Sequence, residues 1–149
     1  FRPVAGRPGD SPMKIDNDYL KTLLDTCQSS VGPTFNILDF EEAGLDYEDP
    51  QFEFHMAILT DKGFIERDDG DPGFGLSKGI DGHLSWSVLP LRLTATGQDF
   101  ADSIHNSEVW SKTKAAASKV GGVGLDLLVQ IAKAEAKRFA SEKLGIPLP

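Results

Sequence analysis

Cysteine is almost absent from this chain: its 149 residues include one, Cys27, so no disulfide can form within the chain. Cys27 follows Leu23 and Leu24 at helical spacing, which favours a buried, inert thiol over a reactive one. No apolar run approaches the roughly 20 residues needed to cross a bilayer, and the first residues lack the apolar core of a signal peptide. These absences predict a cytoplasmic protein that is not inserted in a membrane.

Basic residues are scarce in most of the chain. Residues 13–105 contain 6 Lys and Arg against 18 Asp and Glu, a net charge of −12, whereas residues 106–149 carry a net charge of +3 within a total of −8. Proteins bind DNA largely through Lys and Arg on the phosphates. The acidic part is therefore poorly suited to DNA, and this asymmetry of charge is the strongest functional indication in the sequence.

Groups of residues that support catalysis or cofactor binding are also missing. A metal site needs several ligands close together, but His55, His83 and His105 fall on different predicted elements. The glycines around Phe74 suggest a phosphate-binding loop, yet the segment is strongly acidic and no helix follows it. No Ser, Cys or Lys lies in a recognisable nucleophile motif. We expect no catalytic residue, no metal and no cofactor, and therefore a protein that is not an enzyme.

The spacing of apolar residues predicts helices interrupted by a β-hairpin. Residues 1–12 contain three prolines and two glycines without periodicity, and we expect a disordered leader or expression remnant there. Apolar residues recur at helical spacing from Ile15 to Cys27, and Asp49-Pro50 supplies the start of a later helix. The remaining predicted elements are a short helix at 39–43, strands at 64–66 and 84–93 around a long Gly- and Asp-rich loop, and three C-terminal helices: one capped by Thr94 or Thr96, one that includes Val109, Trp110 and residues 115–117, and one over 125–144.

This order of elements predicts the fold class. Three helices followed by a β-hairpin form the winged-helix arrangement of the helix-turn-helix class. We therefore predict a mostly helical α+β protein with an acidic winged helix-turn-helix domain at residues 13–105 and a helical C-terminal extension at residues 106–149. Its wing is expected to be long and rich in Gly and Asp.

Four stretches of the sequence carry a resemblance to a known family. They are Met13-Lys14-Ile15-Asp16, His55-Met56-Ala57-Ile58-Leu59 with Gly63-Phe64-Ile65, Leu93 to Asp102, and Val109 to Lys114. From Met13 to about Leu144 the chain resembles an uncharacterised bacterial and prophage family, domain of unknown function 2513. The Leu-Thr-x-x-Gly-x-x-Phe stretch followed by Trp-x-Lys is the most specific part. The resemblance implies a winged-helix fold in a bacterium or phage, and it implies no known activity and no catalytic residues.

Candidate partner-binding residues lie on the wing and at the start of a C-terminal helix. Phe74, Leu76 and Ile80 lie in the Gly-rich wing, where they either bind a partner or fold back onto the domain. Trp110 either fills a gap in the core, which we favour, or anchors a partner. The candidate phosphate contacts on the basic segment are Lys112, Lys114 and Lys119.

The last predicted helix suggests self-association. Leu127, Val129 and Ile131 add apolar surface outside its main apolar face. We therefore predict a homodimer through this helix, which a monomeric mass in solution would contradict.

Three functions remain open. We favour a non-enzymatic interaction protein whose acidic domain binds a protein partner, as a DNA mimic or as a modulator of a host complex. The second is a DNA-binding transcriptional regulator that uses the basic C-terminal segment, and its support is analogy of fold. Against it, the exposed positions predicted for the helix from Pro50 are Glu53, Asp61 and Lys62, whereas base-reading helices present Arg, Lys, Asn or Gln. The third is a structural subunit of a larger assembly.

Overall fold

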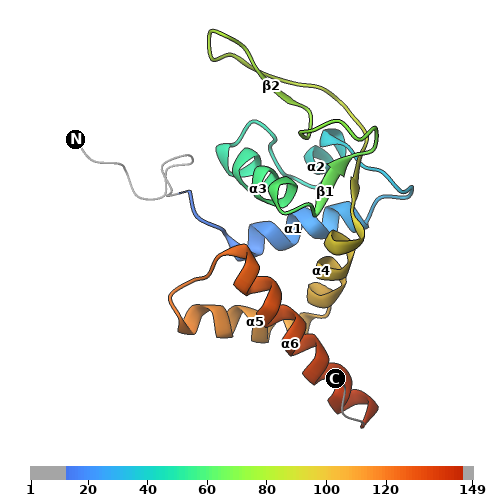
Figure 1. Cartoon of the computed structure of the whole chain (residues 1–149), viewed down its shortest axis with the longest axis vertical. Coiled ribbons are helices and arrows are strands. Elements are labelled where there is room, and N and C mark those ends of the chain that lie inside the picture. The colour runs from blue at the N-terminus through green and yellow to red at the C-terminus, as the bar shows by residue number, and fades with distance from the viewer. Residues whose placement is uncertain (1–12, 146–149) are drawn as a thin grey trace, which may run out of the picture.

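The computed structural model describes residues 13–145 and is mostly helical, with six α-helices and two small antiparallel sheets (Figure 1). The predicted α+β class is thereby confirmed. The helices are α1 (Asn17–Gln28), α2 (Ile37–Glu42), α3 (Pro50–Asp61), α4 (Ala95–His105), α5 (Ser107–Lys119) and α6 (Leu125–Leu144), and the strands are β1 (Ile65–Arg67), β2 (Leu76–Lys78), β3 (Leu84–Trp86) and β4 (Leu91–Leu93). The leader or remnant predicted at residues 1–12 lies outside the described residues.

Side-chain caps set the starts of the first three helices. The Asp16 carboxylate accepts the Tyr19 backbone N–H at 3.0 Å in front of α1, and α2 begins with a reciprocal capping box. At α3 the Asp49 carboxylate accepts the Gln51 N–H at 3.0 Å, and Pro50 occupies the first turn, where its missing N–H costs nothing. Side-chain caps therefore fix where these helices begin. The short helix predicted from residue 39 begins two residues earlier, at Ile37, because Asn36 caps it.

Strand β4 lies between two partners. On one edge it pairs antiparallel with β1, with Ile65 opposite Leu93. On the other edge, Phe35 and Leu91 exchange both backbone hydrogen bonds, at 2.9 and 2.8 Å. The segment between α1 and α2 is thereby joined to the strands that follow α3.

The long loop predicted between two strands contains a hairpin of its own. The sequence predicts one strand over residues 84–93, but the structure divides it into β3 and β4, separated by residues 87–90. Pro90 has no N–H with which to continue a ladder. β2 and β3 form a separate antiparallel pair in which Leu76 lies opposite Trp86, and this hairpin projects away from α4–α6 (Figure 1).

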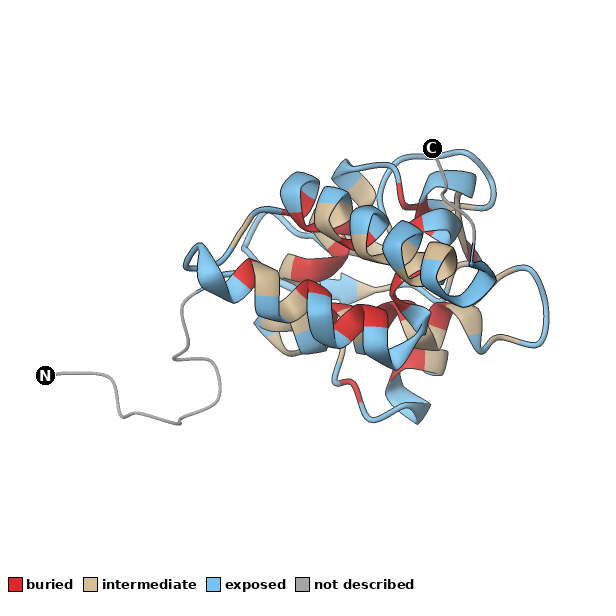
Figure 2. Ribbon diagram, turned by 90° about the horizontal axis from the view of Figure 1, so that it is seen from below, coloured by how far each residue is buried: buried red, intermediate tan, exposed pale blue. Residues whose placement is uncertain are grey.

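One continuous hydrophobic core includes side chains from all six helices. Helices α4, α5 and α6 pack against one another, and α4 also packs against α1, on the side away from the hairpin (Figure 1). Figure 2, seen from below, shows buried stripes along these helices and exposed outer faces. The boundary between a domain and a C-terminal extension near residue 105, which was predicted from charge, stays a prediction. Fully buried members of the core include Leu20, Leu23, Phe40, Phe52, Met56, Phe100 and Leu128.

The Leu-Thr-x-x-Gly-x-x-Phe stretch forms the joint between the strands and α4. Thr94 caps α4 by accepting the Gly97 N–H at 3.1 Å, and its hydroxyl donates to the carbonyl oxygen of Gly63. A Cβ atom on Gly97 would lie 2.1 Å from the Phe64 carbonyl oxygen, so glycine alone fits there without a backbone shift. Phe100 is fully buried against Phe64, with ring centroids 5.6 Å apart. The most specific stretch of the resemblance thus has a structural role.

Candidate partner-binding surface

The accessible side of α3 is acidic and apolar. Residues 22–61, which include α2, α3 and the turn between them, contain nine Asp and Glu and no Lys or Arg. The buried side of α3 holds Phe52, His55, Met56 and Leu59, and its more accessible side holds Glu53, Phe54, Ala57 and Asp61. This side of the domain repels phosphate and attracts cations.

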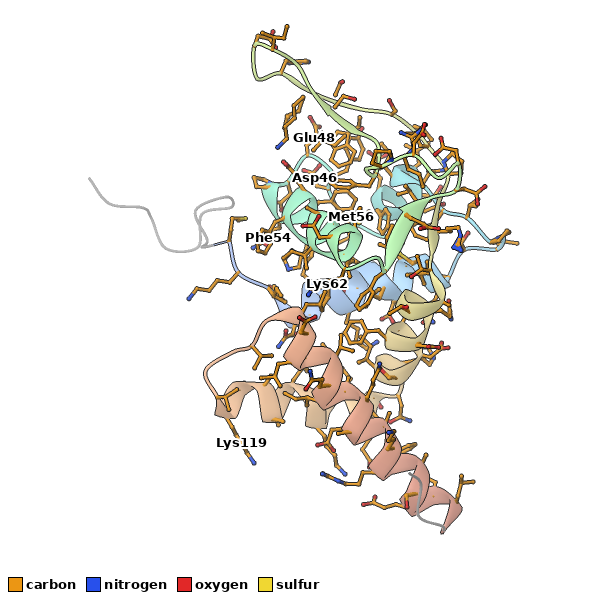
Figure 3. All side chains as sticks on the ribbon, in the orientation of Figure 1. Asp46, Glu48, Phe54, Met56, Lys62 and Lys119 are labelled. Carbon is orange, nitrogen blue, oxygen red and sulfur yellow. The ribbon has the colours of Figure 1, made fainter. Side chains whose placement is uncertain are left out.

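An apolar hollow lies against the first turns of α3. It has a volume of about 340 Å³ and is lined by Met13, Pro50, Glu53, Phe54 and Ala57. Met13 comes from the segment before α1, so two distant parts of the chain form the hollow. In Figure 3 Phe54 lies on the outer side of α3. The hollow can accept an apolar side chain of a partner.

A second hollow combines aromatic rings with carboxylates. It has a volume of about 100 Å³ and is lined by Tyr47, Glu48, Asp49, Glu53, Leu84 and Trp86, so it shares Glu53 with the apolar hollow. The rings of Tyr47 and Trp86 meet edge to face, with centroids 5.8 Å apart. In Figure 3 Asp46 and Glu48 lie between the hairpin and α3. Ring faces and carboxylates both attract cations. We refer to the two hollows together as the α3 surface.

Two of the three wing candidates are half-buried and the third is exposed. The half-buried Phe74 ring packs on Trp86 with centroids 5.8 Å apart, and Trp86 in turn packs on Phe52. Leu76, opposite Trp86 in the hairpin, is also half-buried. Ile80, in contrast, is fully exposed at the hairpin tip. Of the three, Ile80 is the side chain most available to a partner, and the hairpin as a whole folds back onto the domain through Trp86.

Trp110 lies in the core rather than on the surface. It is 6% exposed, and the Lys114 ammonium lies 5.7 Å from its ring centroid. The same ammonium contacts an Asp18 carboxylate oxygen at 2.9 Å and holds the pKa of that carboxyl below its usual value. Trp110 and Lys114 therefore join α5 to α1, so the structure places both in a packing role.

The other candidate phosphate contacts are not gathered into a basic patch. Lys112 pairs with Glu108 one turn earlier at 3.3 Å. Lys119, at the end of α5, is exposed and has no ion-pair partner within residues 13–145. Figure 3 shows it at the opposite end of the molecule from the hairpin. The three lysines thus offer one unpaired charge, far from α3.

The apolar side chains that suggested a dimer are partly covered. Leu127 is 45% exposed, whereas Val129 and Ile131 are half-buried on α6. The homodimer through this helix stays a prediction.

Buried ionisable groups are packed into the fold rather than directed into the hollows. His55 is buried between the Asp16 N–H and the Gln51 carbonyl, and burial lowers the pKa of its ring. Burial raises the pKa of the Cys27 thiol far above its usual value, which keeps it protonated. Among residues 13–145, no group of three or more His, Cys, Asp or Glu could hold a metal ion. In the same part of the chain, no helix has both the length and the apolar character that a membrane crossing requires.

Sequence reasoning missed most of the residues that form the α3 surface. It named Glu53 as exposed but gave no role to Tyr47, Glu48, Phe54 or Trp86. The absence of Lys and Arg from residues 22–61 was the signal that could have located this surface within the acidic domain. The pairing of Tyr47 with Trp86 depends on how the hairpin folds back, which no local pattern reveals.

Comparison with known proteins gives one family. No curated protein and no solved structure was found to match the chain. A family model described as "Hypothetical protein (DUF2513)" matches residues 14–124, which cover α1 to α5 and the whole α3 surface except Met13. Because the match spans well over half of the sequence, the chain belongs to this family of hypothetical proteins, DUF2513.

Proposed function

We propose that this protein is a non-enzymatic winged-helix interaction module of bacterial or phage origin, whose acidic domain binds a basic surface of a protein partner. The winged-helix assignment is supported by the order of the elements. Helices α1, α2 and α3 precede the strands β1 and β4, and β4 lies between β1 and the Phe35 segment. This is the order expected of a helix-turn-helix domain followed by a β-hairpin.

The composition of α3 favours a basic protein surface over DNA as the partner. In a helix-turn-helix protein the second helix of the motif enters the major groove and presents side chains such as Arg, Lys, Asn or Gln to the bases. Here the corresponding helix presents Glu53, Phe54, Ala57 and Asp61. A protein surface rich in Lys and Arg complements this face, whereas DNA phosphate is repelled by it. The domain is thus suited to occupying a site that otherwise holds DNA.

The arrangement of the three candidate phosphate contacts supports the same proposal. Lys112 and Lys114 are paired with carboxylates, and Lys119 lies far from α3. DNA affinity grows with the number of phosphates that are neutralised together. A helix of this charge and a scattered set of lysines make a weak DNA-binding surface.

Affinity enrichment with charge-neutral variants tests the proposal. The double variant Glu48→Gln with Glu53→Gln removes two carboxylates from the α3 surface with little change in side-chain shape. The control, Asp99→Asn with Glu142→Gln, makes the same change in net charge on α4 and α6. We expect basic proteins from a bacterial lysate to bind the wild type and the control at moderate salt, and to be lost from the α3 variant.

A DNA titration tests the opposite outcome. Fluorescence anisotropy of a labelled duplex should show no binding at about 50 mM salt, where electrostatic association is strongest. Binding that weakens steeply towards about 200 mM salt, and that Lys112→Ala with Lys119→Ala removes, would contradict the proposal. That result would make the protein a DNA-binding regulator.

A further inference from the structure

We infer that the α3 surface recognises an arginine or lysine side chain with an apolar neighbour on the partner protein. The cation enters the hollow between Tyr47, Glu48 and Trp86, and the apolar neighbour packs against Phe54 in the adjoining hollow. This inference rests on the proposed function and adds the site and the chemistry that the site selects.

The hollow for the cation is held in place by packing. Trp86 meets Phe52 with ring centroids 5.5 Å apart and Phe74 at 5.8 Å, so the hairpin fixes its ring beside Tyr47. Asp49 is fixed at the N-terminus of α3 by its bond to the Gln51 N–H. A cation placed here meets aromatic rings and the Asp49 carboxylate in positions that are already ordered, which lowers the entropic cost of binding.

A lysine of the chain already places a cation at this site. The Lys78 ammonium from β2 lies 2.9 Å from a carboxylate oxygen of Glu53. Its side chain is 63% exposed, and exposed ion pairs are weak, so an incoming cation can replace it. Glu48 is exposed and has no ion-pair partner among residues 13–145. The hollow therefore retains negative charge even with Lys78 in place.

The apolar hollow provides a second binding position beside the one for the cation. Phe54, Ala57 and Pro50 present apolar surface beside Glu53, which also lines the aromatic hollow. Because the two hollows share this residue, one short segment of a partner reaches both. The apolar side chain adds affinity and distinguishes the partner from basic chains in general.

The two tryptophans of the chain provide the measurement. Trp86 lies in the hollow and Trp110 lies in the core, so their indole N–H resonances report the site and an internal reference. We would titrate the ¹⁵N-labelled full chain with N-acetylarginine methylamide and, as a neutral control of the same shape, N-acetylcitrulline methylamide. The Trp86 resonance should shift and saturate with the arginine compound, while Trp110 stays fixed and the citrulline compound has no effect.

Tripeptides test the apolar half of the site. Acetyl-Leu-Arg-Leu-amide should bind at least about threefold more tightly than acetyl-Ala-Arg-Ala-amide, as burial of even a small part of a leucine side chain predicts. Phe54→Ala should abolish that difference. Glu48→Gln should weaken both peptides about 1.4- to 5-fold, the usual range for an exposed ion pair, and Asp99→Asn should weaken neither.

Three results would overturn the inference. The first is an unchanged Trp86 resonance, and the second is an equal response to the citrulline compound. The third is a Trp86 shift that depends on protein concentration without any peptide, which would assign the surface to a second copy of the chain. If any of these occurs while Glu48→Gln with Glu53→Gln still abolishes protein capture, the inference fails and the proposed function stands. Salt-sensitive DNA binding would instead refute the proposed function.

Discussion

Mild acid should destabilise this protein through His55. The imidazole is fully buried, its Nε2 accepts the Asp16 N–H at 2.9 Å, and its Nδ1 lies 2.8 Å from the Gln51 carbonyl oxygen. A neutral ring with its proton on Nδ1 makes both bonds. A second proton, on Nε2, would oppose the Asp16 N–H and place a charge in the core. Protonation therefore breaks the connection between α3 and the start of α1.

The direction and size of the effect follow from linkage. Burial lowers the pKa of His55 below 6.5, against the opposing effects of the Gln51 carbonyl and the Asp16 carboxylate. The unfolded chain thus binds a proton that the folded chain binds less readily. The contribution of neutral His55 to the free energy of unfolding is therefore fully present above pH 6.5 and falls as the pH drops below it. Because one proton is involved, the slope cannot exceed about 1.4 kcal/mol per pH unit. The loss levels off once the pH is below the pKa of the folded form.

Urea unfolding followed by fluorescence, between pH 7.5 and 5, measures this slope. Asp18 does not interfere, because its pKa is lowered from 3.8 and its contribution disappears in more acidic solution. His55→Leu should be less stable at neutral pH but should show a flatter pH dependence. His105→Asn, at an exposed position, should keep the wild-type slope. A slope that survives in His55→Leu, or is absent from the wild type, would refute the reasoning.

Two further predictions concern packing. Gly97→Ala should lower the free energy of unfolding by about 3 kcal/mol, because the new Cβ meets the Phe64 carbonyl oxygen. The control Gly124→Ala should lower it by less than about 1 kcal/mol, because nothing lies within 4 Å of the new Cβ. Urea unfolding compares the two, and equal losses would contradict the close approach at Gly97. Phe74→Ala should cost about 1–2 kcal/mol because its ring is half-buried, and Ile80→Ser should stay within about 0.5 kcal/mol because its side chain is fully exposed. A thermal melt in which both variants match the wild type would show that Phe74 does not hold the hairpin.

The extent of successful prediction differs between helices and strands. The sequence predicted the helix over residues 125–144, and Thr94, one of two candidate caps, forms the cap of α4. Caps and helical periodicity act over a few residues, so the local sequence contains them. The strand predicted over residues 84–93 was too long, because the alternation of apolar residues continues through a segment that Pro90 removes from the ladder.

Some features of the candidate site could likewise be predicted from the sequence, and others could not. Composition alone located the negative charge, and the place of Trp110 at the start of a predicted helix favoured the core position that the structure gives it. The charge of a segment depends only on which residues it contains, so it requires no knowledge of the fold. Pairing between lysines and carboxylates, in contrast, depends on position: Lys114 is distant in sequence from Asp18 and yet contacts it.

The sequence by itself determined the helical α+β class, the starts of most helices and the excess of carboxylates in residues 13–105, because each is a property of neighbouring residues or of simple composition. The tertiary structure alone decided that the hairpin folds back, that Trp86 meets Tyr47 beside Glu48, and that Met13 closes the apolar hollow. These contacts join residues far apart in the chain, and they form because burying Trp86 and Phe74 against Phe52 stabilises one arrangement of the hairpin over the others.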